Sequence, residues 1–302
     1  MRLCAVSVDL DEIPFYFQIH GLSEPSFAER SLVYERALDR LTTFAADAQI
    51  PLTLFAIGAD LTADAAARLK SARDAGHEIA NHSLDHRYDL TRLDRKEILA
   101  QIDRGASEIA RAVGERPVGF RAPGYTITDT VFDALAELGM VYDSSVFPCP
   151  VYWSAKAAAM GAIRLRGRAS KSILDTPKVL LAPTTPYRVG RPYWTRGHGV
   201  LELPIQVTRG LRLPFIGTAL TLAGLRGAQL LTHMCVGEPL VNLELHAIDV
   251  LDASDGLDAL VPHQPDVRVT KERKRETLHA VVDLLRNKGY SFVTLREAAA
   301  RV

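Results

Sequence analysis

The sequence LCAVSVDLDE (residues 3–12) decides the fold, because an apolar run rich in β-forming residues ends there on three carboxylates. Such a run predicts a strand. Outward from it, the first half of the chain alternates further β-like runs with helical patterns. Strands are predicted at 51–57, 77–80, 117–121 and 140–147, and helices at 29–48, 59–75, 94–113 and 128–139. This alternation predicts parallel strands with helices packed outside them, in either an open doubly wound sheet or a barrel.

The middle of the chain breaks this rhythm. Residues 147–200 carry many prolines and aromatic residues, which predicts long loops with room for a hairpin. We expect an insertion that wraps the scaffold, and a single domain over residues 1–302, because no flexible linker marks a boundary. After the insertion, strands are expected at 200–205, 239–246 and 290–295, and helices at 216–233, at 270–287 and at the end of the chain.

Composition excludes several classes of protein. The 302 residues include 36 basic and 36 acidic side chains, so no global field attracts nucleic acid, and we expect no nucleic-acid partner. Hydrophobic residues at 47% and charged residues at 24% are typical of globular chains. The three cysteines form no CxxC pair, which fits a reducing compartment and gives no thiolate zinc site. With acidic residues by Asp9 and no apolar leader, we expect a cytoplasmic protein.

Four polar clusters lie near the predicted carboxyl ends of strands, where α/β folds build their sites. They span residues 9–12, 81–86, 120–125 and 243–246. His82 and His86 are four residues apart, so on one helical turn they would share a face and could hold one divalent ion. With an aspartate added, such a set leaves coordination positions open, as catalytic metal sites do. The alternative is a polar loop with two unrelated histidines.

Two aspartates at one strand end allow a division of labour. Strand alternation points Asp9 and Asp11 to the same side, so one could bind a metal while the other acts as a general base. Capping of the strand end is the simpler reading. An apolar strand that ends in DxD also opens the haloacid dehalogenase-like phosphatases, which bind Mg²⁺, but no convincing later DD pair is present.

The other two clusters offer the remaining catalytic groups. His246 ends an apolar strand and suits a general acid, although such a histidine can equally be structural. Arg121 could hold a carboxylate with two hydrogen bonds, or be an ordinary ion-pair partner. The bend at Pro123 could turn the amide of Gly124 or Tyr125 toward an oxyanion.

In this order, the clusters resemble the motifs of the polysaccharide deacetylase family, also known as the NodB-homology domain or carbohydrate esterase family 4. The matching segments are SVDLDE (7–12), HSLDH (82–86), RAPGY (121–125), YDSSVFP (142–148) and LELH (243–246), with KGYSFVTLREA (288–298) similar to the closing strand and helix. The resemblance implies a distorted (β/α) barrel of about seven strands.

The resemblance also implies a role for each matching residue. Asp11, His82 and His86 would bind one divalent metal ion, most often zinc, with cobalt, manganese, nickel or iron as alternatives. Asp9 would act as the base that activates metal-bound water, and Arg121 would orient it. The remaining roles are an amide of Gly124 or Tyr125 for the oxyanion, and His246 as the acid that protonates the departing amine.

The chain departs from the pattern of well-known members. Leu10 separates two aspartates that are adjacent in those members, which is similar to a DxD/DxE branch that includes peptidoglycan deacetylase-like proteins. Some relatives in that branch act on small cyclic amides without metal. The tryptophan usual in the fourth motif is missing, which is why Asp143 and Asp249 are both candidates for orienting the acid.

We therefore expect a metal-dependent amide hydrolase that removes an N-acetyl or N-formyl group from an amino sugar. A lipid-linked or nucleotide-linked sugar intermediate fits a cytoplasmic enzyme. Residues 211–231 are apolar nearly all round, with Arg209, Arg212 and Arg226 nearby, and either contact the inner membrane face or form a buried barrel helix. Three alternatives remain: a metal-independent hydrolase of small amides, a DxD phosphatase, and a non-catalytic glycan- or lipid-binding barrel. The sequence does not predict an oligomeric state.

Overall fold

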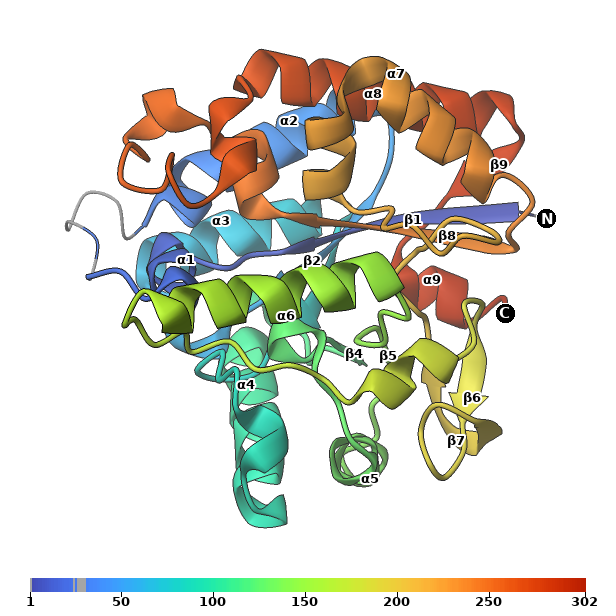
Figure 1. The fold of residues 1–302 in the computed structure, drawn as a ribbon. Helices are drawn as coiled ribbons and strands as arrows, with labels where there is room; N and C mark the ends of the chain where they lie inside the picture. The colour runs from blue at the N-terminus through green and yellow to red at the C-terminus, as the bar shows by residue number, and fades with distance from the viewer. Residues whose placement is uncertain (1, 24, 26–30) are drawn as a thin grey trace.

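The fold is built on one nine-stranded sheet, seen in a computed structural model that describes residues 2–23, 25 and 31–302 (Figure 1). The strand order is β6-β7-β5-β4-β3-β2-β1-β8, with β9 also paired to β1. Every pairing is parallel except that of β6 with β7. The strands are β1 Arg2–Asp9, β2 Leu52–Ala56, β3 Glu78–Asn81, β4 Gly119–Phe120, β5 Tyr142–Asp143, β6 Tyr187–Val189, β7 Arg196–Glu202, β8 Leu240–His246 and β9 Tyr290–Phe292.

The first strand lies at the centre of this sheet, as its sequence predicts. Seven of the eight residues of β1 are buried, because β2 and β8 flank it and helices cover it. A strand enclosed in this way gains stability from apolar residues on both faces. The predicted strands after it are confirmed in place and direction. The sheet curls into a distorted (β/α) barrel, as expected, and its nine strands among the described residues include β6, which the insertion adds.

Two ends of the curled sheet are joined by an irregular segment. After β7, the amide of Gln206 donates to the carbonyl of Asn242 in β8, with N and O 3.1 Å apart. The Asn242 side chain returns the contact, since its Nδ2 donates to the carbonyls of Leu203 at 3.0 Å and Pro204 at 3.2 Å. Side-chain and loop contacts therefore close the barrel where no strand pair does so in the described parts of the chain.

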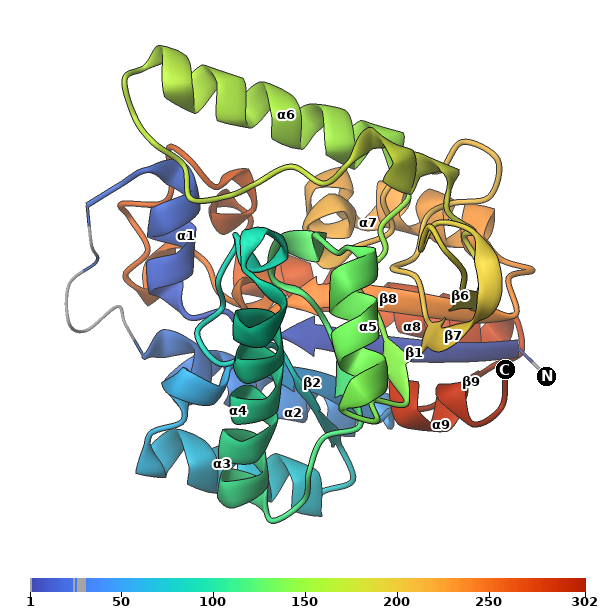
Figure 2. The same ribbon diagram turned by 90° about the horizontal axis from the view of Figure 1, so that it is seen from below.

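Helices surround the sheet (Figure 2). They are α1 Ile13–His20, α2 Leu38–Ala48, α3 Ala63–Asp74, α4 Arg95–Val113, α5 Asp129–Glu137, α6 Pro150–Leu165, α7 Gly217–Cys235, α8 Lys271–Asn287 and α9 Leu295–Ala299. Several begin at side-chain caps that satisfy the first amides: Thr62, Asp94, Thr128, Thr270 and Thr294. A short π-helical turn, Val33–Ala37, precedes α2, and residues 29 and 30 of the predicted helix 29–48 lie outside the described residues.

Helix α4 lies directly against the loop that follows β3, and Gly105 makes this contact. A Cβ at Gly105 would lie 2.6 Å from the carbonyl carbon of Ser83 and 2.8 Å from Oδ1 of Asn81. The Asn81 side chain also donates to the carbonyl of Ile102 in α4, at 2.9 Å. Glycine is therefore required for α4 to support the histidine-bearing loop at this distance.

The segment 147–200 differs from its prediction. The expected hairpin is present as β6 and β7, but helix α6 occupies 16 residues that were predicted as loop. Pro150 stands at the first turn of α6, where proline is tolerated, and the following residues are rich in alanine. None of the α6 side chains is fully buried, so its sequence carries no apolar stripe that would have revealed it.

Helix α7 covers most of the apolar stretch 211–231 and is buried on one side only. One side of α7, which includes Leu220, is buried in the barrel, whereas Leu222 and Leu230 are 50% and 63% exposed. The helix bends at Gly224, whose φ is 66° and ψ 178°. Among the described residues, no helix combines the length and apolar character that crossing a membrane requires.

Candidate active site

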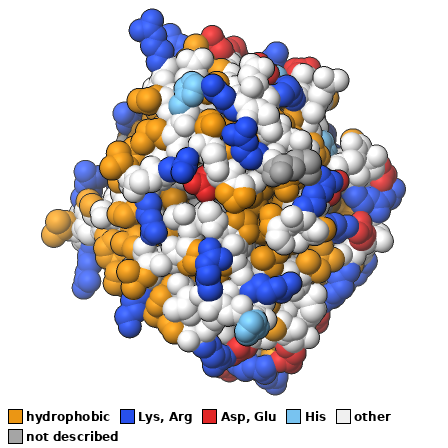
Figure 3. All heavy atoms as spheres, turned by 90° about the vertical axis from the view of Figure 1, so that its right-hand side faces the viewer, with side chains coloured by type: hydrophobic (Ala, Val, Ile, Leu, Met, Phe, Trp, Pro, Cys, Tyr) orange, Lys and Arg blue, Asp and Glu red, His pale blue; other side chains and the backbone are white. Residues whose placement is uncertain are grey.

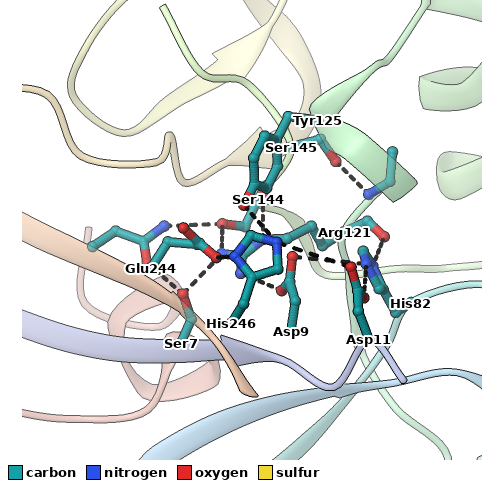
Figure 4. A network of polar contacts seen from close by, with 12 residues as sticks. Ser7, Asp9, Asp11, His82, Arg121, Tyr125, Ser144, Ser145, Glu244 and His246 are labelled. Atoms are coloured by element: carbon teal, nitrogen blue, oxygen red, sulfur yellow. Dashed lines mark hydrogen bonds and ion pairs between the residues drawn. The ribbon is translucent and has the colours of Figure 1, made fainter. Parts of the chain in front are cut away.

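The carboxyl ends of the central strands bring the polar clusters together (Figure 4). In the parallel ladder, Asp9 at the end of β1 pairs with His246 at the end of β8. Asn81, which ends β3, pairs with Phe120 of β4, so the histidine and arginine clusters follow side by side. Parallel sheets place their sites at this edge. Clusters separated by more than 200 residues of sequence thus lie together at one edge of the sheet.

Asp11, His82 and His86 form a compact, buried group. Asp11 Oδ1 lies 3.3 Å from His82 Nε2 and 3.2 Å from His86 Nε2, and the two Nε2 atoms are 3.2 Å apart. Within residues 2–23, 25 and 31–302, Asp11 Oδ1 makes no hydrogen bond although it is shielded from solvent. A dehydrated carboxylate oxygen that faces two imidazole nitrogens fits a divalent cation, and these three side chains can hold one.

The hydrogen bonds of this group favour metal-binding tautomers. His82 Nδ1 lies 2.7 Å from the carbonyl oxygen of Arg121, which can only accept, so Nδ1 carries the proton and Nε2 is left as a ligand. Burial lowers the pKa of His86 below its usual value, despite nearby Asp11. Burial raises the pKa of Asp11, but the two imidazoles outweigh it and hold that pKa well below the ordinary range. Burial also lowers the pKa of His82, but Asp9 and Asp11 outweigh it and raise that pKa, so the group combines an ionised carboxylate with two imidazoles whose pKa values move in opposite directions.

The four-residue spacing of His82 and His86 suggested a shared helical turn. The structure instead places both histidines on a loop. Ser83 and His86 have φ angles of 71° and 50°, in the left-handed region that costs non-glycine residues roughly 1–2 kcal/mol each. The Ser83 hydroxyl accepts the His86 amide at 3.1 Å. The rings of Phe15 and Tyr88 flank the His86 ring, with centroids 4.4 and 4.8 Å away. A strained backbone, rather than helical spacing, brings the two Nε2 atoms together.

Asp9 is held by a fully buried arginine. Arg121 Nη1 donates to Asp9 Oδ1 at 2.6 Å, and Asp9 Oδ2 lies 3.7 Å from His82 Nε2. The rest of the guanidinium is also engaged: Nε donates to the Ser144 carbonyl at 2.7 Å, and Nη2 to the hydroxyls of Ser7 and Ser144, both at 2.8 Å. Asp9 is thereby fixed beside Asp11, His82 and His86, which we call the Asp11 group. The guanidinium of Arg121 already contacts Asp9 Oδ1.

His246 faces the same cavity from the opposite side. Its Nε2 lies 3.2 Å from the Tyr125 hydroxyl and 3.9 Å from Asp11 Oδ2, while its Nδ1 lies 3.0 Å from Glu244 Oε1. Burial lowers the pKa of His246, but Glu244, Asp11 and Asp9 outweigh it and raise that pKa well above the usual value. The imidazole is therefore kept protonated, which is the state of a general acid.

The carboxylate beside the His246 ring is Glu244, and neither Asp143 nor Asp249 occupies that place. Asp249 Oδ2 accepts the backbone amide of His246 at 2.9 Å, where it caps the short turn after β8. Asp143 accepts the amide and hydroxyl of Ser145, at 3.0 and 2.8 Å. Glu244 precedes His246 by two residues on one strand, so both side chains project from the same face. That spacing was a usable signal in the sequence.

Of the two amides predicted to face an oxyanion, that of Tyr125 is already engaged. It donates to the carbonyl of Ala122 at 3.1 Å, which leaves Gly124 as the remaining candidate. Both residues line the cavity, with φ angles of 64° at Gly124 and 58° at Tyr125. This turn projects the Tyr125 hydroxyl toward His246.

The site opens into a cavity of about 160 Å³, the catalytic cavity. Helix α6 forms one wall, a position that sequence reasoning missed along with the helix. Of the insertion's aromatic residues, Tyr152 lines the cavity, whereas Tyr187 and Tyr193 pack in the core. The lining residues are Asp11, Tyr16, Ile19, His20, Tyr88, Gly124, Tyr125, Tyr152, Lys156, Ala159, Met160, Ile163, Ser170, Ser172 and His246.

Comparison of the sequence with known families gives one match. The model of the polysaccharide deacetylase family matches residues 32–142, which include His82, His86 and Arg121. A peptidoglycan deacetylase-like protein from Gibberella zeae, FGM2, is 38% identical over 77 residues, which are 26% of this chain and 22% of that protein. The chain thus matches only about a quarter of this relative's length.

Solved structures show the same fold over nearly the whole chain. A protein assigned to the polysaccharide deacetylases from Mycobacterium smegmatis superposes with a TM-score of 0.54, at 20% identity, over 97% of this chain and 93% of that one. A pseudoenzyme of carbohydrate esterase family 4 from Bacillus anthracis gives 0.51 at 13% identity, over 99% and 65%. The second likeness means that the fold alone does not establish catalysis. Residues 32–142 are therefore similar in sequence to the polysaccharide deacetylase family, and the whole chain shares the curled barrel fold of the solved structures.

Proposed function

We propose that this protein is a divalent-metal-dependent hydrolase that removes an N-acetyl or N-formyl group from an amino sugar. One observation carries the proposal. Three groups lie side by side: an aspartate with two histidines, a second aspartate held by an arginine, and a histidine backed by a glutamate, and Asp11 and His246 of these groups line the catalytic cavity. Hydrolysis of an amide needs an activated water, a base and an acid for a poor leaving group, and this arrangement supplies each of them.

Asp11, His82 and His86 would hold the metal ion, because their donor atoms meet and Asp11 Oδ1 has no hydrogen bond in the described structure. A bound divalent ion supplies Lewis-acid activation of water and of the amide carbonyl. Asp9 is a poorer ligand, since Arg121 Nη1 already lies 2.6 Å from its Oδ1. A guanidinium at that distance would repel a second cation.

The remaining residues move protons. As water adds to the amide carbon, Asp9 accepts the proton that the water loses, and Arg121 keeps the carboxylate in place. As the carbon–nitrogen bond breaks, protonated His246 gives its proton to the amine nitrogen. Glu244 on Nδ1 stabilises the imidazolium until then and directs Nε2 toward the cavity. The Tyr125 hydroxyl, 3.2 Å from Nε2, adds a polar contact on the substrate side.

The alternative functions fit the geometry less well. A DxD phosphatase would use Asp9 as an exposed nucleophile, but Asp9 is 1% exposed and paired with Arg121. A metal-independent hydrolase would have no use for the hydrogen-bond-free oxygen of Asp11. A non-catalytic binding barrel would not need a histidine kept protonated by a buried glutamate.

We propose that the substrate is a lipid-linked or nucleotide-linked amino sugar, which the protein binds on the cytoplasmic side of a membrane. Exposed leucines on and before α7, with Leu211 at 68% and Leu230 at 63% exposure, support contact with a membrane surface. Figure 3 shows a face where Lys and Arg side chains are interspersed with hydrophobic ones. Liposome flotation tests this contact, and a Leu222→Asp, Leu230→Asp variant should float less than the wild type.

The function is tested by acyl release. Zinc-loaded protein incubated with N-acetylglucosamine oligomers and with an N-formylated amino sugar should release acetate or formate, and Asp9→Asn should abolish the release while the metal stays bound. Chelation should stop turnover and added zinc or cobalt should restore it. Absence of acyl release from every substrate, with metal bound, would contradict the proposal.

A further inference from the structure

The catalytic cavity adjoins a second hollow that is lined by basic residues. Met160 and Ser170 line both the catalytic cavity and an open depression of about 480 Å³. We call this depression the basic hollow, and its lining residues are Met160, Arg164, Gly167, Arg168, Ala169 and Ser170. A substrate whose acylamino group lies at the Asp11 group can therefore extend past Ser170 without leaving the protein surface.

The segment that forms the hollow is strongly basic in a chain of zero net charge. Residues 144–174 contain five cations, Lys156, Arg164, Arg166, Arg168 and Lys171, and no Asp or Glu. None of the five lies within 4.0 Å of a carboxylate in the described residues. Cations at the carboxyl end of a helix interact favourably with the helix dipole. This interaction explains the presence of basic residues near Leu165, where α6 ends, but not that of the other cations. Lys156 lies within the helix, and Lys171 lies well beyond its end.

The basic segment is fixed in place against α1. The Lys171 amide donates to the carbonyl of Gln18 at 3.2 Å. A Cβ at Gly21 would lie 3.0 Å from the Ala169 oxygen and 3.1 Å from Arg168 Cβ, so the two segments touch. In Figure 1, α6 crosses in front of the barrel and its far end returns to α1. Helix α1 starts directly after the Asp11 cluster, and the cations are thereby held at a set distance from it.

The nearby cations act on His263, which lies beside His20. His20 lines the catalytic cavity, and its ring centroid lies 5.8 Å from that of His263. Burial lowers the pKa of His263, and His20, Arg168 and Arg166 lower it further. Inside the cavity, Lys156 Nζ donates to the Gly124 carbonyl at 2.9 Å. Burial lowers the pKa of Lys156, and Asp175 partly opposes this, so the arginines carry the uncompensated charge. Among the described residues these arginines have no carboxylate within 4.0 Å, and an anionic ligand would relieve their mutual repulsion.

We propose that the substrate carries a phosphate group, bound in the basic hollow by Arg164 and Arg168 while its acylamino group lies at the Asp11 group. This proposal rests on the proposed function. Guanidinium groups bind phosphate oxygens through paired, charge-assisted hydrogen bonds, and the Ser170 hydroxyl adds a donor. A soluble sugar phosphate and a lipid-linked sugar phosphate present the same chemistry to the hollow.

The test compares three substrates of the metal-loaded full chain: N-acetylglucosamine, its anomeric phosphate ester, and the same phosphate joined to a short prenyl chain. We expect kcat/KM to be roughly 10- to 100-fold higher for at least one phosphorylated substrate, with the preference shrinking as salt is added. A preference for both phosphates identifies the phosphate as sufficient, whereas a preference for the prenyl form alone identifies a lipid-linked source.

In an Arg164→Ala, Arg168→Ala variant, the ratio of kcat/KM for the preferred phosphorylated sugar to kcat/KM for the neutral sugar should fall close to one. Both arginines are exposed, so the variant should keep its Tm. Arg275→Ala, on α8 and also exposed, is the matched control and should keep the wild-type ratio. Equal turnover of neutral and phosphorylated sugars by the wild type, or a ratio unchanged in the double variant, would overturn the phosphate site and leave the proposed function intact.

If no substrate is turned over, the proposed function fails but the phosphate site can still be judged. Calorimetry then measures binding of the sugar phosphate and of the neutral sugar to the wild type and the double variant. Tighter binding of the phosphate, lost in the double variant, supports the site. Equal binding of both sugars, or no binding of either, rejects it.

Discussion

Glu244 and His246 lie two residues apart on β8, and Glu244 Oε1 is 3.0 Å from His246 Nδ1. The glutamate is fully buried, and among the described residues its oxygens make no hydrogen bond that meets ordinary angular limits. This carboxylate raises the pKa of His246, and it also contributes to the raised pKa of Arg121. This pair ties the protonation of His246 to a residue that has no direct contact with substrate.

Replacing Glu244 with Gln should lower kcat about 10- to 100-fold with little change in KM, because the imidazolium loses its counter-charge. The pKa of His246 should fall with it. Activity that needs protonated His246 is lost as pH rises through that pKa, so the basic limb of the kcat/KM profile should move to lower pH. Steady-state kinetics over a pH series measures both effects, with exposed Glu272→Gln as the control. A pH profile that does not move would contradict this role for Glu244.

His82→Ala should lose both bound metal and turnover, since it removes one of three ligands. Elemental analysis of purified protein gives the metal content, and acyl release gives the activity. His198→Ala, an exposed histidine on β7, should match the wild type in both. Full activity in a metal-free His82→Ala protein would refute the metal mechanism.

Asp9→Asn should separate metal binding from catalysis. Asparagine keeps an oxygen for Arg121 but cannot accept the proton of the attacking water, so we expect kcat to fall roughly 100- to 10,000-fold with metal content unchanged. Metal analysis and acyl-release kinetics on one preparation decide the point. Loss of metal in this variant would show that Asp9, rather than Asp11, is a ligand.

Glu202 should make stability depend on pH. Burial, and then neighbouring Asp143, raise the pKa of Glu202 well above its ordinary value. In the unfolded chain Glu202 loses its proton at about pH 4.3, whereas in the folded protein it keeps that proton to higher pH. The free energy of unfolding should therefore fall as pH rises from there through the folded-state pKa.

Glu202→Gln removes that dependence and should be more stable than the wild type at about pH 8. Glutamine can still accept the Val146 amide, which Glu202 Oε1 accepts at 3.0 Å. Urea unfolding at several pH values measures the effect. Parallel curves for the two proteins would show that Glu202 is ionised in the fold.

Gly105→Ala should destabilise the protein by about 2 kcal/mol or more, because the added methyl group would meet the backbone of Ser83 at 2.6 Å. Gly161→Ala is the matched control, since a Cβ at that position of α6 has nothing within 4 Å. There, alanine should stabilise the helix by up to about 1 kcal/mol. Equal stability of the two variants would mean that α4 can move away from the histidine loop.

The strands could be predicted from the sequence because each is an apolar run of residues. The polar residues at the ends of these runs could be singled out in the same way. β1 and β8 read as apolar runs that end on polar residues, and parallel pairing brings their ends together. Helix α6 was not predictable from periodicity, since it buries no side chain and starts at a proline. The partner of His246 was missed because attention fell on Asp143 and Asp249, although Glu244 stood two residues away on the same strand face.

The close contact at Gly105 also bears on how this protein could be redesigned. Helix α4 packs closely against the backbone of the histidine loop, because a Cβ at Gly105 would lie 2.6 Å from the carbonyl carbon of Ser83. A change in the shape of this loop would therefore require α4 to move. Helix α6 has open space at Gly161 and no buried side chain, yet it forms a wall of the same cavity. Libraries that aim to broaden the range of accepted sugars should therefore diversify α6 and leave α4 untouched.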